Sequence, residues 1–122
     1  MENLGLISET FNYDSLIAGH QILISSGIIL EQGQNLTRGA VLGKIAATGK
    51  YILSVAAASD GSEVPLAVLA KDTDATLEDQ KTVVYEAGEL NENALILGAG
   101  HTPDSIRFAL RDLGIYLKKS IA

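Results

Sequence analysis

The sequence VLGKIAATGKYILSV, residues 41–55, consists of two apolar runs separated by a turn. Thr48, Gly49 and Lys50 lie between the runs, as small and polar residues do in the loop of a β-hairpin. We therefore expect an antiparallel pair of strands that joins residues 41–45 to residues 51–55. A hairpin in the middle of a short chain predicts a meander of short strands.

The segments that follow this hairpin also have the lengths of strands. Asp60 and Gly61 form a turn signal, after which VPLAVLA, residues 64–70, is apolar enough for a strand that is buried on both faces. Pro65 should lie near the start of that strand, because proline cannot donate to a β-ladder. Residues 81–90, KTVVYEAGEL, predict a further strand, and NALIL predicts a last short one.

Upstream of the hairpin, residues 22–24 and 28–30 are apolar and flank the turn-forming letters SSG, so we expect two short strands there. Residues 1–19 mix isolated apolar and polar side chains without a sustained helical or strand period. This difference in pattern divides the chain into an N-terminal arm, residues 1–19, and a single β-rich domain, residues 20–122. The arm should be flexible in the free protein.

One helix is predicted, near the C-terminus. Thr102 has the side chain of an N-cap, Pro103 suits the first helical position, and Asp104 places negative charge at the positive end of the helix dipole. Lys118 and Lys119 would balance the other end. Helical periodicity then places a stripe of side chains against the sheet: Ile106, Ala109, Leu110, Leu113, Tyr116 and Leu117.

The side of this helix opposite the stripe carries two more apolar residues. Phe108 and Ile115 are seven positions apart, which is two helical turns, so we expect both on one face that contacts another subunit. The alternative is that they are scattered surface hydrophobics, which are common in soluble proteins.

Composition excludes several classes of function. The formal charge of −6 and the nine scattered Lys and Arg residues argue against binding to nucleic acid, whose phosphates require clustered cations. Without Cys there is no disulfide, thiolate metal site or cysteine nucleophile. The N-terminus lacks the features of a signal peptide, and no apolar run approaches the ~20 residues of a membrane span, so we expect no membrane partner and no export.

No motif in the chain predicts catalysis. His20 and His101 are the two histidines, and neither has a second ligand at the spacing of a metal site. The acidic run at residues 71–81 lacks the central glycine and the final glutamate of a calcium loop, and GAGHT at residues 98–102 lacks the further glycine or lysine of a phosphate-binding loop. We expect no enzyme, no cofactor and no metal site; a pair of carboxylates that only the fold brings together is the alternative that the sequence leaves open.

Taken in order, five segments resemble the head decoration protein D family of tailed phages: LTRGAVLGKI, ATGKY, DGSEVPLAVLAKDTDAT, VVYEAGELNENALILGAGHT and ALRDLGIYLKK. The similarity extends over residues 37–119, and YDSLIAG upstream is similar to the way many members enter the fold. The resemblance implies a mainly β fold of the β-clip kind, with short strands and hairpins, one C-terminal helix and the flexible arm.

The resemblance also implies a function without catalysis. A homotrimer of such a protein binds the outer surface of the expanded virion capsid at three-fold and quasi-three-fold positions, after assembly in the host cytoplasm. Its arm pairs with strands of the major capsid protein and so cements the shell against internal DNA pressure. In this chain TFNY alternates as a strand does, and the candidate capsid-binding residues are Thr10, Phe11, Tyr13, Leu16 and Ile17.

Other classes of function stay open from the sequence. In one alternative, the arm segment is a strand that completes the protein's own sheet, which is how many N-termini are held. In a second alternative, the domain is a β-barrel or β-clip binding module, either carbohydrate-binding or a lipoyl-like carrier. Lys50 is the hairpin lysine that a carrier would modify, but the neighbours typical of a modified lysine are missing. A small enzyme is the third alternative.

Overall fold

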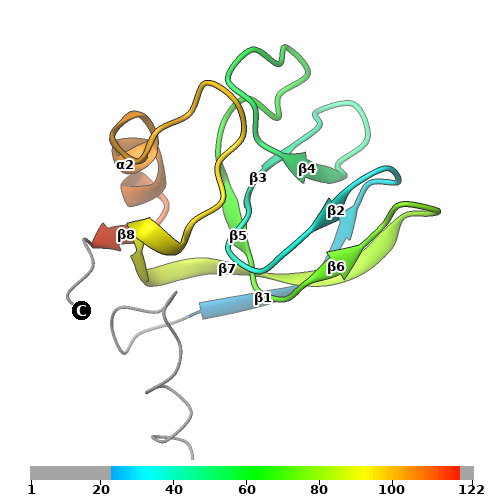
Figure 1. Ribbon diagram of the computed structural model, residues 1–122, viewed down its shortest axis with the longest axis horizontal. Coiled ribbons are helices and arrows are strands. Elements are labelled where there is room, and N and C mark those ends of the chain that lie inside the picture. The colour runs from blue at the N-terminus through cyan, green and yellow to red at the C-terminus, as the bar shows by residue number, and fades with distance from the viewer. Residues whose placement is uncertain (1–22, 119–122) are drawn as a thin grey trace, which may run out of the picture.

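The computed structural model describes residues 23–118, and in these residues a six-stranded sheet closes into a small barrel (Figure 1). The sheet order is β1 (Leu23–Leu30), β4 (Tyr51–Leu53), β3 (Val41–Lys44), β5 (Ala67–Leu69), β7 (Gln80–Asn91) and β8 (Ile115–Lys118). β7 also pairs with β1, and this pairing closes the barrel. The short strands β2 (Asn35–Leu36) and β6 (Thr73–Asp74) form a separate ribbon.

The predicted hairpin is confirmed: β3 and β4 pair antiparallel, with Leu42 opposite Leu53. The two strands expected upstream are one strand, β1, which runs along seven residues of β7. A break in register between Ser26 and Ile28 accommodates the SSG segment as a bulge. The long β7 provides a continuous partner, so the turn signal bends the strand without ending it.

Two layers of side chains explain why the central strands are apolar on both faces. Leu42, Leu69 and Val84 belong to one buried cluster, together with Leu30 and alanines, which lies between the strands of the barrel. Their chain neighbours Val41, Val68 and Tyr85 point to the opposite faces of the same strands and belong to a second cluster. The other members of this cluster are Leu90, Ile106, Leu110 and Ile115. All three residues of β5 are buried, as the sequence predicted.

After β7 the chain forms a 3₁₀ turn, η1 (Glu92–Ala94), which includes the first two residues of the strand that the sequence predicted at residues 93–97. Only Ile96 in this region makes a β-bridge, to Ala40. The chain then continues into the helix α2 (Pro103–Asp112). The N-cap prediction is confirmed: Thr102 accepts from the backbone of Ser105, and the Ser105 hydroxyl accepts from the backbone of Thr102.

The helix is shorter than the sequence predicted. Gly114 adopts a φ of +95°, which reverses the chain just beyond the end of α2, and residues 115–118 continue as β8. β8 pairs parallel with β7, with Ile115 opposite Gly88. Tyr116 and Leu117 therefore lie in a strand and do not extend the helical stripe, whereas Ile106 and Leu110 are buried as expected.

The expectation that two lysines balance the helix dipole is also wrong for Lys118, which lies in β8 with its Nζ 3.6 Å from Glu89 Oε1. Lys119 lies outside the described residues, as does the predicted boundary between arm and domain at residues 19 and 20. Within residues 23–118 the fold class is confirmed: the chain is mainly β with a single C-terminal helix.

Candidate functional site

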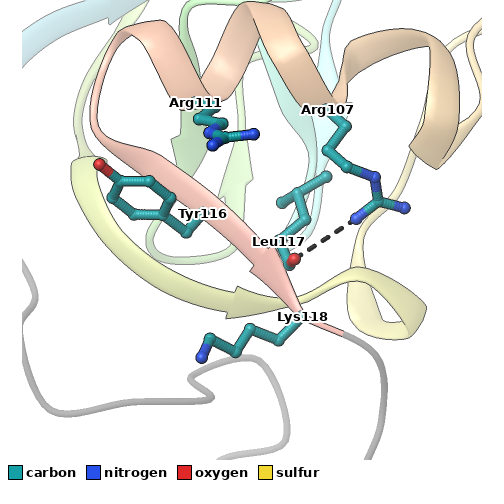
Figure 2. A pocket seen from close by; sticks show the side chains of 5 residues that line it. All are labelled: Arg107, Arg111, Tyr116, Leu117 and Lys118. Carbon is teal, nitrogen blue, oxygen red and sulfur yellow. Dashed lines mark hydrogen bonds between the residues drawn. The ribbon is translucent and has the colours of Figure 1, made fainter.

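A groove between α2 and β8 is the candidate site in the described part of the chain. Figure 2 shows the helix running above the strand, with Arg111 and Leu117 in the space between them and the Lys118 side chain drawn below the strand. The groove has a volume of about 240 Å³, and its lining residues are Arg107, Arg111, Tyr116, Leu117 and Lys118. The reversal at Gly114 positions it, because the strand after the turn passes back beneath the helix.

Ion pairs hold one side of the groove in place. The Arg107 guanidinium lies 2.8 Å from Glu92 Oε1 and 3.0 Å from Asp104 Oδ1, and it also donates to the Leu117 carbonyl oxygen at 3.4 Å (Figure 2). The contacts with the two carboxylates, first that with Asp104 and then that with Glu92, raise the pKa of Arg107. Arg107 therefore joins η1, α2 and β8, and its charge is largely offset by two carboxylates.

The other cations of the groove are less engaged. Arg111 makes no ion pair within residues 23–118, and its guanidinium lies over the ring of Phe108 at 5.9 Å from the centroid. Lys118 has Glu89 as a distant partner at 3.6 Å. Positive charge is thus available at the groove in a protein whose formal net charge is −6.

Apolar side chains are also exposed around the groove. Phe108 is 67% exposed, Leu113 44% and Tyr116 47%, and all three belong to α2, β8 or the turn between them. Aromatic residues together with Arg are the composition that protein interfaces favour. The arrangement is that of a binding surface for a chain with apolar and acidic side chains, and it contains no nucleophile with an adjacent base.

The two residues of the predicted subunit contact, Phe108 and Ile115, lie in different surroundings. Phe108 is exposed on α2, so it stays available for a contact. Ile115 does not share its helical face: it is the first residue of β8, has no exposed surface and packs in the core with Leu110. The shared face is wrong because Gly114 ends the helical geometry between the two residues. The candidate capsid-binding residues, Thr10, Phe11, Tyr13, Leu16 and Ile17, lie outside the described residues.

The residues considered for chemistry have structural partners. His101 Nε2 lies 3.1 Å from the hydroxyl of buried Ser54, whereas His20 lies outside the described residues. In the acidic run, Asp72 accepts from the Arg38 backbone and Asp74 from Thr76, so both stabilise turns. Between Leu23 and Lys118 no group of three or more His, Cys, Asp or Glu side chains is placed to bind a metal.

Lys50 is held by an ion pair. Its Nζ lies 2.8 Å from Asp79 Oδ2, and this carboxylate also accepts from the backbone of Gln32. The hydrogen bond from Lys50 is the main cause that lowers the pKa of Asp79. The lysine thus ties the β3–β4 hairpin to the start of β7, and this engagement gives no support to a carrier lysine presented to another enzyme.

Sequence reasoning missed the groove, because it placed residues 103–117 on one continuous helix. The residues Ile-Tyr-Leu after Gly114 provided a signal, since β-branched and aromatic residues following a glycine are typical of a strand that starts after a turn. That signal competed with a helical period that continued through the same positions.

The sequence model of the family described as bacteriophage lambda head decoration protein D matches residues 6–116. No curated protein matches the chain. The helix within the described residues is too short and too polar to cross a membrane.

Proposed function

Because the chain belongs to the bacteriophage lambda head decoration protein D family, a family of structural capsid proteins, we propose that it binds as a homotrimer to the outer surface of the expanded capsid. It attaches at three-fold and quasi-three-fold sites and stabilises the shell against the pressure of packaged DNA. The family match over residues 6–116 carries this proposal, since it includes most of the arm as well as the domain. The small barrel with one C-terminal helix is consistent with it.

The arm is the proposed link to the major capsid protein. Phe11 and Tyr13 alternate with polar residues, so an extended arm would present both on one side while its backbone adds to an edge strand of the shell. Full burial of each large apolar side chain contributes roughly 1.5–3 kcal/mol, before the cost of ordering the backbone. Leu16 and Ile17 are two further apolar residues of the arm, closer in the sequence to the domain.

A trimer increases the effect of each arm. Once one arm is bound, the other two are held close to their own sites, so their binding is intramolecular and depends on effective concentration. Arms that bind weakly one at a time can then join neighbouring capsomers firmly. We propose that Phe108, with its ring 67% exposed beside Arg111, contributes to the contact between subunits.

Deletion of residues 1–17 tests the role of the arm. The shortened protein should melt near the temperature of the full chain and have the same number of subunits by light scattering, since the deletion stops before β1 (Leu23–Leu30). It should no longer co-sediment with expanded capsids. A full-length double variant, Phe11→Ser with Tyr13→Ser, should lose most of the binding as well.

Two results would contradict this assignment. Retained co-sedimentation of the shortened protein would show that the domain, not the arm, supplies the capsid contact. An unfolded product would show that the segment completes the protein's own sheet. A monomeric mass for the full chain, measured in the same light-scattering series, would remove the trimer from the proposal.

A further inference from the structure

The groove between α2 and β8 has chemistry that the proposed capsid binding does not use. It is lined by Arg111 and Lys118, whose charges are incompletely offset, together with the ring of Tyr116 and the side chain of Leu117. Such a surface favours an extended chain that alternates acidic and apolar side chains, because the cations attract the former and the aromatic surface covers the latter. The occupant should therefore be acidic and without lysine or arginine.

The first 22 residues of this same chain have that composition. They contain three acidic residues, Glu2, Glu9 and Asp14, and no Lys or Arg, so the side-chain charge of the segment is −3 with His neutral. Every Lys and Arg of the chain lies at or beyond Arg38. Phe11 and Tyr13 lie between the last two acidic residues in the sequence, where they would meet the Tyr116 ring while the acids pair with the cations.

The segment also joins the domain beside the groove. Leu23, the first residue of β1, is opposite Ala87 of β7, and the next residue of β7, Gly88, is opposite Ile115 at the start of β8. The attachment point and the strand that floors the groove are thus neighbours along β7. At ~3.3 Å per extended residue, the segment reaches far beyond a four-residue strand, and the tether gives it an effective concentration of millimolar order.

We propose that, in the free protein, the acidic N-terminal segment of each chain docks into the α2–β8 groove of its own domain. This docking occurs in the protein before it binds a capsid, so it is independent of the proposed capsid binding. The experiment that tests the docking needs no capsid. Such a contact shields the apolar arm from solvent and from other arms, and it is weak enough to be displaced, since exposed charges are screened by salt.

Paramagnetic broadening in the full-length protein tests the proposal. The chain has no cysteine, so Ser8→Cys provides a single site for a nitroxide label. We expect loss of amide peak height at Tyr116, Leu117 and Lys118, with the amides of the β3–β4 loop as the unaffected reference. The loss should be smaller in high salt. It should disappear in the double variant Arg111→Glu with Lys118→Glu and return when Glu9→Lys and Asp14→Lys are added.

A matched control is available in Lys44→Glu with Lys81→Glu, which makes the same change of charge at two exposed lysines outside the groove and should leave the broadening unchanged. Mixing chains that carry both the nitroxide and ¹⁵N with an excess of chains that carry neither identifies which chain donates the segment. Broadening that persists on dilution supports docking to the same chain. Broadening that falls on dilution assigns the segment to a second copy, and uniform or absent broadening leaves the groove without this occupant; both results overturn the proposal.

Discussion

Substitution of Gly98 by Ala tests how the loop before α2 is held against the barrel. Gly98 is buried, and a Cβ built on it would overlap the carbonyl oxygen of Ser54 and lie 3.0 Å from Val55 Cγ2. The obstacle is backbone at the end of β4, which a rotamer change cannot move. Either the loop or the strand end must therefore shift.

The expected loss in the free energy of unfolding follows from the contacts between this loop and the end of β4. Forcing a methyl group into a packed site typically costs about 1–3 kcal/mol. Two hydrogen bonds cross the same contact, from the Ala56 amide to the Ala99 carbonyl at 3.0 Å and between Ser54 Oγ and His101 Nε2 at 3.1 Å, and each is worth about 1 kcal/mol. We expect a loss of about 2–4 kcal/mol, which lowers the melting temperature by roughly 10 °C or more in a domain of this size.

Thermal and urea unfolding followed by circular dichroism measure this loss, with all proteins at one chain concentration because an oligomer's stability depends on it. Gly49→Ala is the control: its φ is +76° and no atom lies within 4 Å of a built Cβ, so it adds only backbone strain of about 1 kcal/mol. If Gly98→Ala is no less stable than Gly49→Ala, the loop does not approach β4 as described, and the steric argument is wrong.

Three further predictions concern the cap, the ion pair and the exposed ring. Thr102→Ala should cost about 1 kcal/mol in urea unfolding, because the helix loses its N-cap, and an unchanged midpoint would contradict the capping box. The pKa of Asp79 is lowered in the folded state, chiefly by Lys50, so wild type should be more stable than Asp79→Asn above about pH 4. This difference in stability should vanish as the pH falls through the lowered pKa of Asp79. A difference that persisted below that pH would contradict the stabilising role of the Asp79 charge. Phe108→Ser should shift the light-scattering mass toward the monomer, whereas Leu77→Ser, at a side chain 86% exposed, should not; equal behaviour would remove Phe108 from the subunit contact.

Local signals predicted most of the domain correctly. The turn at residues 48–50 and the apolar runs beside it were sufficient for the β3–β4 hairpin, because loop and strands are adjacent in the chain. The start of α2 was equally predictable, since Thr102 and Pro103 act on backbone groups within one turn. The family resemblance over residues 37–119 is consistent with the match to residues 6–116.

The C-terminal prediction failed where two local signals competed. Leu110, Leu113 and Leu117 keep a helical period across Gly114, so periodicity alone favoured one long helix. The structure ends the helix at Asp112, because Gly114 takes up a positive φ and the residues after it gain a ladder with β7. That ladder is a contact with residues more than 20 positions away, which no local pattern reports.

The sequence by itself determined the fold class, the hairpin, the helix start and the absence of a recognisable catalytic motif, because each depends on neighbouring residues or on composition. Only the tertiary structure decided that Ile115 is buried in the core and that Arg111 and Lys118 share one groove. Those side chains come from a helix and a strand whose relative position depends on the parallel pairing of β8 with β7. The groove forms only when β8 pairs with β7, because that pairing sets the position of β8 relative to α2. The sequence patterns of α2 and β8 do not contain this information.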